Sequence, residues 1–131
     1  MASDITVELR AEVARRAEYR CEYCGIHEHE AGFAHQVDHI ISRKHGGSSA
    51  SLNLAYACLL YNRYKGTDLA SIDPESGEPV RLFHPRRDLW TDHFLLESHR
   101  VVGLSGPGRA TVQVLRLNAP ERIAERKLIA R

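Results

Sequence analysis

The stretch that decides the fold spans residues 21–66 and reads, in order, Cys21-Glu22-Tyr23-Cys24, Val37-Asp38-His39-Ile40-Ile41, Gly46-Gly47-Ser48, Asn53-Leu54, Cys58 and Asn62-Arg63-Tyr64-Lys65-Gly66. An Asp-His pair on its own is common in proteins. The ordered combination of such a pair, a glycine-containing loop and two asparagines is typical of a site that cleaves phosphodiesters with a metal ion.

Residue types in this stretch predict two strands followed by a short helix. Residues 35–41 contain β-branched side chains that favour a strand, and residues 52–57 are apolar enough for a second one. The glycines and serines between them predict an open loop. Residues 58–65 fit a helix of about two turns, which Gly66 is well placed to end.

The side chains at these positions suit phosphodiester hydrolysis, which requires a base, a stabilised leaving oxygen and charge compensation. His39 can act as the base, because an unperturbed imidazole has a pKa near about 6.5 and is mostly neutral at physiological pH. Asp38 and Asn62 offer oxygen atoms to a hard cation, and such ligands favour Mg²⁺ or Mn²⁺.

The adjacency of Asp38 and His39 makes a geometric prediction, because neighbours in a regular strand point to opposite faces. Both can serve one phosphate only where the strand bends, bulges or ends, so we expect a break at or just after Asp38. Asn62 and Lys65 are three residues apart and share one helix face. Lys65 there either reaches a phosphate or complements the helix dipole.

Residues 21–66, about a third of the chain, resemble the HNH endonucleases, a family built on a β-β-α-metal finger. The resemblance implies that His39, Asn53 and Asn62 are the catalytic residues, with His39 as general base and Asn53 holding the loop and His39 in place. It also implies that Asp38 and Asn62 bind the divalent ion. The implied activity is nicking or cutting of DNA to leave a 5′-phosphate.

Three cysteines predict a second, structural metal site. Many family members hold the finger together with two Cys-x-x-Cys pairs. Here Cys21 and Cys24 form the first pair, whereas in the second Cys58 is present and Tyr61 stands at the position of the other cysteine. Zn²⁺ prefers four ligands in a tetrahedron, and tyrosine is a poor one. Three outcomes are open: a histidine completes a Cys3His site, Zn²⁺ is held weakly with water, or the thiols pack as core groups. The candidate histidines are His27 and, alternatively, His29 or His35.

The net charge of the 131 residues is only +1, so any DNA contact must come from local clusters of charge. Contacts to nucleic acid are expected from Arg43, Lys44, Arg63 and Lys65. A second basic cluster comprises Arg81, His84, Arg86 and Arg87. We expect its segment to be core and turn, with Phe83, Trp90 and Phe94 buried and the arginines paired to Asp88 or Asp92. In the alternative, His84, Arg86 and Arg87 extend the phosphate track.

The expected fold class is α+β, with residues 1–131 as one domain. It comprises a small β-β-α-metal (HNH) core at residues 20–68, an N-terminal helix and a C-terminal α+β extension at residues 69–131. Thr6 can cap a helix over residues 6–19, with Val7, Val13, Ala14 and Ala17 on its apolar face. In the extension we expect a turn at 73–77, strands at 79–83, 94–97 and 100–104, a chain break at 105–108, and helices at 109–117 and 120–130.

The expected setting is the reducing cytoplasm. An odd number of cysteines argues against a disulfide framework. No apolar run approaches the roughly 18 residues that cross a bilayer, and no secretory signal is visible.

The leading functional hypothesis is a metal-dependent endonuclease acting on DNA. The alternative is a non-catalytic or weakly catalytic zinc-knuckle module that binds nucleic acid. A third is a domain that becomes active only within a larger assembly. A phosphate site does not by itself distinguish DNA from RNA.

Overall fold

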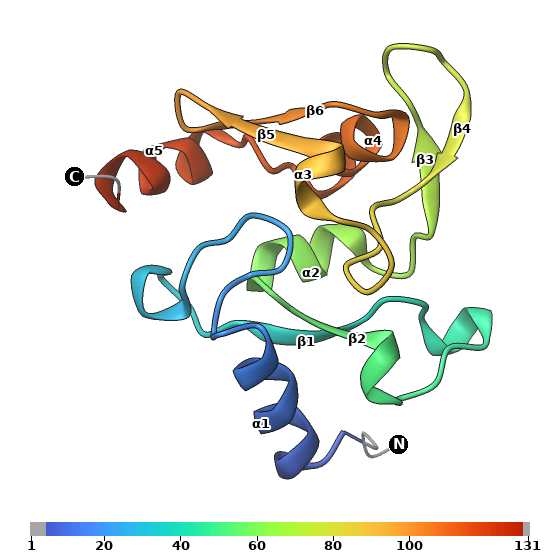
Figure 1. Ribbon diagram of the computed structural model, residues 1–131, viewed down its shortest axis with the longest axis vertical. Coiled ribbons are helices and arrows are strands. Elements are labelled where there is room, and N and C mark those ends of the chain that lie inside the picture. The colour runs from blue at the N-terminus through green and yellow to red at the C-terminus, as the bar shows by residue number, and fades with distance from the viewer. Residues whose placement is uncertain (1–4, 130–131) are drawn as a thin grey trace.

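The computed structural model describes residues 5–129, and its elements fall into an N-terminal and a C-terminal group (Figure 1). The first group contains, in order, α1 (Val7–Arg16), β1 (Gln36–His39), β2 (Leu54–Ala57) and α2 (Leu59–Lys65). The second contains β3 (Ala70–Ile72), β4 (Pro79–Arg81), α3 (Trp90–His93), β5 (Phe94–Glu97), β6 (Arg100–Gly103), α4 (Gly106–Leu115) and α5 (Pro120–Ile129). Short 3₁₀ turns lie at Glu28–Glu30, Arg43–His45 and Ser51–Asn53. This mixture of helices and small sheets agrees with the predicted α+β class.

The hairpin of β1 and β2 and the helix α2 follow one another as predicted. The two strands are antiparallel, with Gln36 opposite Ala57 and His39 opposite Leu54. α2 starts directly after Cys58 and packs against β1. It ends at Gly66, whose φ of +52° lies in the left-handed region that glycine adopts without strain.

The N-terminal helix is shorter than predicted. Thr6 caps it, because the hydroxyl accepts a hydrogen bond from the Leu9 amide at 3.0 Å. α1 ends at Arg16, and the next residues reverse direction with positive φ at Glu18 and Tyr19. Of the predicted apolar face, Val13 and Ala14 are buried, whereas Val7 is 79% exposed, so that part of the prediction is wrong.

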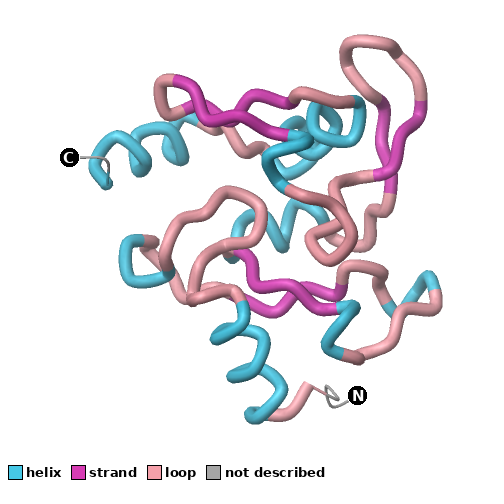
Figure 2. Tube along the Cα trace, in the orientation of Figure 1, coloured by secondary structure: helices cyan, strands magenta, loops and turns pink. Residues whose placement is uncertain are grey.

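The strands form three separate two-stranded antiparallel sheets, with α2 between the first and second and α3 between the second and third (Figure 2). The hairpin of β5 and β6 turns through Ser98 and His99, both with positive φ, as a two-residue hairpin loop requires. The strand β3 and the one-turn helix α3 were not predicted. The expected helix over residues 120–130 corresponds to α5, and Ala130 lies outside the described residues.

The predicted chain break at residues 105–108 is wrong, because these residues open α4. The Ser105 hydroxyl caps the helix by accepting a hydrogen bond from the Gly108 amide at 3.0 Å. A Cβ at Gly108 would collide with the His93 carbonyl oxygen. This glycine therefore allows α4 to pack closely against the preceding segment rather than ending a helix.

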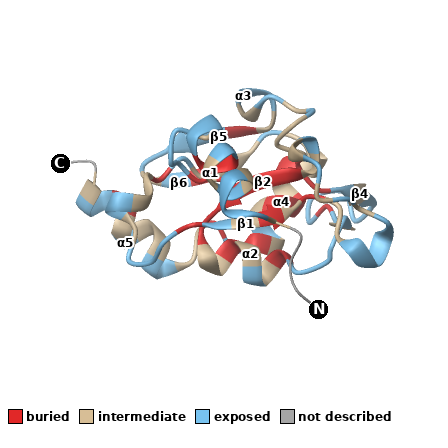
Figure 3. Ribbon diagram, turned by 90° about the horizontal axis from the view of Figure 1, so that it is seen from below, coloured by how far each residue is buried: buried red, intermediate tan, exposed pale blue. Residues whose placement is uncertain are grey.

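The core joins the two groups of elements. Its largest cluster consists of Cys21, Tyr23, Ala57, Cys58 and Tyr61 from the first group and Phe83, Phe94, Val101, Leu115 and Leu117 from the second. α2 contacts β1 on one side and α4 on the other, and Figure 3 shows buried residues concentrated on β2, α2 and α4. Within residues 5–129, no helix combines the length and apolar character needed to span a bilayer.

Candidate functional site

The hairpin and α2 bring three predicted site residues to one pocket. Asp38 and His39 are the last two residues of β1, and Asn62 lies in the middle of α2. All three line an open pocket of about 330 Å³. The rest of its lining is Val37, Ser42, Arg43, Lys44, Gly66 and Thr67.

The predicted break at or just after Asp38 is not seen, because β1 continues through His39 and ends after it. The pairing with β2 keeps a regular register through His39, without a bulge, and β1 stops there. Asp38 and His39 accordingly contact different neighbours. The Asp38 carboxylate meets Tyr23 and Lys65, whereas the His39 ring meets Ser49.

Asp38 is buried, with 3% of its surface exposed, and its carboxylate has two partners. The Tyr23 hydroxyl donates to Oδ2 at 3.1 Å, and the Lys65 Nζ lies 3.3 Å from Oδ2 and 3.4 Å from Oδ1. Burial raises the pKa of Asp38 above its ordinary value, and the Lys65 ammonium and the Tyr23 hydroxyl offset only part of that rise.

Lys65 is not the surface cation that the sequence predicts. Its side chain is 3% exposed, and its Nζ also donates to the carbonyl oxygens of His39 and Ile40, each at 3.1 Å. An ammonium needs partners when it is buried, and Lys65 finds them on β1 and directly beyond its end. Lys65 therefore has almost no exposed surface with which to make the expected contact to nucleic acid.

The Asn53 side chain fixes the loop that contains Ser49, the hydrogen-bond partner of His39. Its Oδ1 accepts from the Ile41 amide at 2.9 Å, and its Nδ2 donates to the carbonyls of Ile41 at 2.8 Å and Ser48 at 2.7 Å. Ser49 follows Ser48 in this loop, and its Oγ lies 2.9 Å from the Nε2 of His39. Glycine is needed at Gly47, because a Cβ there would collide with the Ile41 carbonyl.

Asn62 has an oxygen available for a ligand. Its Nδ2 donates to the Oε1 of Gln36 at 3.0 Å, and among the described residues no donor to its Oδ1 is seen. Together with the Asp38 carboxylate, the pocket therefore contains two hard oxygen donors.

The basic residues around the pocket differ in exposure. Arg43, Lys44 and Arg63 are exposed, as contacts to a nucleic acid require. In the second basic cluster, Arg81 pairs with Asp88 at 2.6 Å and Arg86 pairs with Glu22. Arg87 is exposed, and no ion pair is seen for it among the described residues.

The second basic cluster lies beside the loop between β1 and β2, which contains Gly47. His84, Arg86 and Arg87 line one pocket of about 510 Å³ with residues of that loop. Phe83 and Phe94 are buried as predicted, whereas Trp90 is only partly buried. Of the predicted ion pairs, Arg81 reaches Asp88, but Arg86 pairs with Glu22 instead of Asp88 or Asp92. Burial lowers the pKa of His84, and the nearby Arg87 guanidinium lowers it further.

The three cysteines form the predicted cluster. The Sγ atoms of Cys21, Cys24 and Cys58 lie within 4.8 Å of one another, and the last two are 3.9 Å apart. Burial raises the pKa of Cys21. Burial acts in the same direction on Cys24, but hydrogen bonds from the other two thiols lower its pKa below the ordinary value. Three sulfur atoms this close together can serve as ligands of one thiophilic cation.

The fourth ligand predicted from sequence is not in this cluster. Within residues 5–129, no histidine or carboxylate joins the three thiols. The Nδ1 of His27 accepts from the His29 amide at 3.1 Å, and the two rings stack on each other. The Nε2 of His35 bonds the Ile26 carbonyl at 2.9 Å. Tyr61 is wholly buried, and its hydroxyl accepts from Arg126 at 3.1 Å.

Sequence reasoning missed the contacts that hold the predicted residues in place. Tyr23 and Lys65 hold Asp38, Ser49 orients His39, and Arg126 of α5 reaches Tyr61 from more than sixty residues away. The serines after Gly46-Gly47 offered a weak signal for Ser49. Nothing in the local sequence pointed to Arg126.

Comparison with known proteins identifies the segment that carries the site. No curated protein and no solved structure matches the chain. Residues 21–67, about a third of the chain, match the family model described as HNH endonuclease. This range contains Asp38, His39, Asn53, Asn62 and the three cysteines. Residues 21–67, which contain the candidate site, are thus similar to HNH endonucleases.

Proposed function

We propose that this protein is a metal-dependent endonuclease that hydrolyses DNA phosphodiester bonds and leaves a 5′-phosphate. His39 is the general base, and Asp38 and Asn62 hold a divalent ion. One observation supports this most: these three side-chain types line a single pocket, although they come from a strand and a helix. In this proposal β1, β2 and α2 form a β-β-α-metal finger.

The hydrogen bond to Ser49 defines how His39 would work. When Nε2–H donates to the Ser49 Oγ, the lone pair of Nδ1 is left to accept a proton from the attacking water. Asn53 is a positioning residue in this proposal, because its three hydrogen bonds fix the loop that carries Ser49. A neutral imidazole held in one orientation meets the requirements of a general base.

The donor set fits Mg²⁺ or Mn²⁺. The Oδ1 of Asn62 accepts no hydrogen bond among the described residues, and the carboxylate of Asp38 has lone pairs beyond those used by its two partners. An ion bound there would offset the charge that develops on the phosphoryl and leaving oxygens. Lys65 would have to loosen its contact with Asp38, because two cations at one carboxylate repel each other.

The charges around the pocket support a nucleic-acid substrate, and we propose that it is DNA. Arg43 and Lys44 line the pocket itself, and Arg63 is exposed on the same helix as Asn62. Exposed cations of this kind contact phosphates and position a duplex without reading its sequence. We place the protein in the reducing cytoplasm, where its three free cysteines would stay available for metal.

A plasmid-nicking assay tests the proposal. Supercoiled plasmid is incubated with the protein and Mg²⁺ or Mn²⁺, with chelator, and with His39→Ala. We expect nicked circles only with metal, and a rate about 10²–10⁴-fold lower for His39→Ala. His45→Ala is the matched control, because this exposed imidazole lies on the same loop away from Asp38. A wild-type protein that retards DNA but nicks it under no divalent metal overturns the proposal.

A second candidate is a binding module that does not cleave. It is favoured by one observation: the Lys65 ammonium is buried against the Asp38 carboxylate and compensates its charge. In this case DNA binding is equally strong with metal and with chelator, and no nicks accumulate. The same assay, combined with a gel-shift titration, therefore separates the two candidates.

A further inference from the structure

We propose that Cys21, Cys24 and Cys58 bind one thiophilic ion such as Zn²⁺ through three thiolates, with an exchangeable fourth ligand. That ligand is a small soft donor, a low-molecular-weight thiol, which enters through the adjoining pocket. This inference is independent of the nuclease proposal, because it concerns the opposite end of α2 from Lys65 and Asp38.

The three thiols are close enough to share an ion. Their Sγ atoms lie within 4.8 Å of one another, and Cys24 and Cys58 are separated by 3.9 Å. Cys21 and Cys58 are buried and Cys24 is partly exposed. Thiolates favour thiophilic ions over Mg²⁺ or Mn²⁺, so this cluster and the Asp38 pocket would select different metals.

Tyr61 does not supply the fourth ligand. It stands three residues after Cys58 on α2, but its hydroxyl is turned to Arg126 of α5, which donates to it at 3.1 Å. Arg126 also donates to the carbonyls of His99 and Leu117, so its guanidinium is fixed from several sides. The hydroxyl is therefore held by a neighbouring cation instead of by the thiol cluster.

No other described side chain supplies the fourth metal ligand in place of Tyr61. Within residues 5–129, the group of potential metal ligands contains the three cysteines and no histidine or carboxylate. A tetrahedral ion held by three protein ligands keeps one position for water or an added donor. The described residues thus leave this position open.

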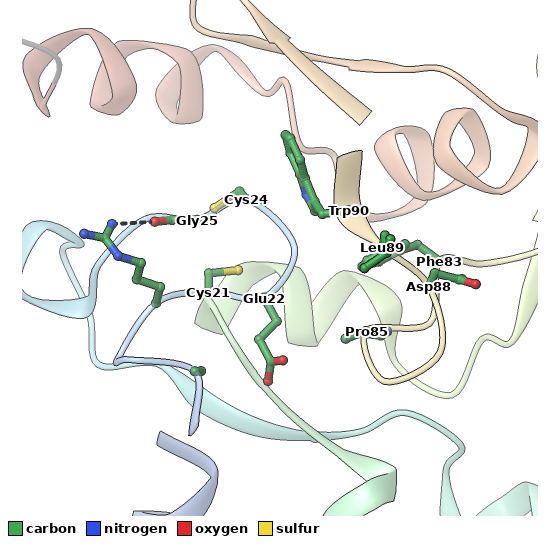
Figure 4. A pocket seen from close by; sticks show the side chains of 11 residues that line it. Cys21, Glu22, Cys24, Gly25, Phe83, Pro85, Asp88, Leu89 and Trp90 are labelled. Atoms are coloured by element: carbon green, nitrogen blue, oxygen red, sulfur yellow. Dashed lines mark hydrogen bonds between the residues drawn. The ribbon is translucent and has the colours of Figure 1, made fainter. Parts of the chain in front are cut away.

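A cavity gives access to the cluster from solvent. Cys21 and Cys24, but not Cys58, line an open pocket of about 420 Å³, and Phe83, Leu89 and Trp90 form another part of its wall (Figure 4). A water ligand fits there, but the largely apolar wall favours a donor that also carries hydrocarbon. A small thiol satisfies both requirements, and on binding it becomes a thiolate and releases its proton to solvent.

Cobalt absorption tests this inference. The full-length protein, kept reduced with a phosphine, is loaded with Co²⁺ and titrated with 2-mercaptoethanol. We expect one Co²⁺ per chain with thiolate-to-cobalt charge transfer from three sulfurs. Added thiol should then shift the visible bands and raise the charge-transfer absorbance by about one third, as four thiolates replace three.

Two further measurements make the result decisive. Tyr61→Phe keeps the buried ring and removes the hydroxyl, so we expect an unchanged cobalt spectrum and an unchanged response to thiol. Trp90 is the single tryptophan of the chain, and its emission should change when thiol is added to the Zn²⁺ form but not to the metal-free form. Failure to bind Co²⁺, a spectrum altered by Tyr61→Phe, or a spectrum that ignores added thiol each overturns the inference.

Discussion

At the scale of single residues, Lys65 decides whether Asp38 is available to a metal ion. Its ammonium is buried against that carboxylate, and breaking a buried pair by removing one partner costs about 3–5 kcal/mol. We therefore expect Lys65→Met to lower the melting temperature in chelator. Mn²⁺ should restore more of the lost stability than it adds to the wild type, because the ion can take the place of the ammonium.

Thermal unfolding with chelator and with Mn²⁺ measures this effect. Lys44→Met serves as the control, because Lys44 is exposed on the same pocket. Equal stabilisation of Lys65→Met and wild type by Mn²⁺ would mean that the ion does not bind at Asp38.

At the scale of elements, the loop between β1 and β2 depends on Gly47. A Cβ there would collide with the Ile41 carbonyl and would press on the Asn53 Nδ2 at 2.9 Å. We expect Gly47→Ala to destabilise the protein by about 1–3 kcal/mol, as overpacking does. It should also slow nicking at least about tenfold by displacing Ser49 and His39. Gly32→Ala is the matched control, because nothing lies within 4 Å of its Cβ position. Equal effects of the two substitutions in urea unfolding and nicking assays would contradict the role of the loop.

The ion pair between Arg109 of α4 and Asp73 of the turn after β3 predicts that part of the protein's stability is lost at low pH. The hydrogen-bonded Arg109 guanidinium holds the pKa of Asp73 well below its usual range. A carboxyl whose pKa is depressed in the folded state contributes stability above its unfolded pKa of about 3.9 and loses it as pH falls through the folded value.

We therefore expect Asp73→Asn to be less stable than wild type at pH 7, with the difference shrinking as pH falls below about 4. Urea unfolding at pH 7, 4 and 3 measures it. Asp68→Asn is the control, because Asp68 is exposed and its side chain forms no bond seen among the described residues. A stability difference that stays constant with pH would argue against the ion pair.

How far each element could be predicted depended on where its determinants lie. β1, β2, α2, β5 and β6 were predictable because β-branched runs and flanking turn residues are local signals. β3 has only three residues, too few to show a period, and the start of α4 was obscured because Gly106-Pro107-Gly108 looks like a chain break. Gly108 is required because a Cβ there would collide with the His93 carbonyl oxygen, and no local sequence pattern indicates this contact.

The candidate site divides in the same way. The types and order of Asp38, His39 and Asn62 along the chain were enough to predict a shared pocket, and the hairpin and α2 bring them to one. Their partners could not be predicted. The Tyr23 and Ser49 hydroxyls reach Asp38 and His39 through tertiary packing, which sequence spacing does not indicate. Lys65 was placed on the helix face of Asn62 from its spacing, but its burial against Asp38 was not predicted.

At the scale of the whole molecule, the shared core makes the N-terminal group of elements dependent on the C-terminal group. Tyr61 and Cys58 pack with Phe94, Leu115 and Leu117, and Arg126 bonds the Tyr61 hydroxyl. We propose that the chain is one folding unit rather than a finger with an appended tail. A chain ending at residue 68 should show no cooperative thermal transition and should bind a dye that reports exposed apolar surface. A truncated protein that melts cooperatively would contradict this.

Separating metal binding from cleavage tests the central claim most directly. Calorimetric titration with Mn²⁺ and plasmid nicking are measured on wild type, Asn62→Ala and His39→Ala. We predict that Asn62→Ala loses at least about tenfold in Mn²⁺ affinity together with nicking, whereas His39→Ala binds Mn²⁺ like wild type and does not nick. Wild-type Mn²⁺ affinity in Asn62→Ala, or wild-type nicking by His39→Ala, would contradict an active centre formed by His39, Asp38 and Asn62.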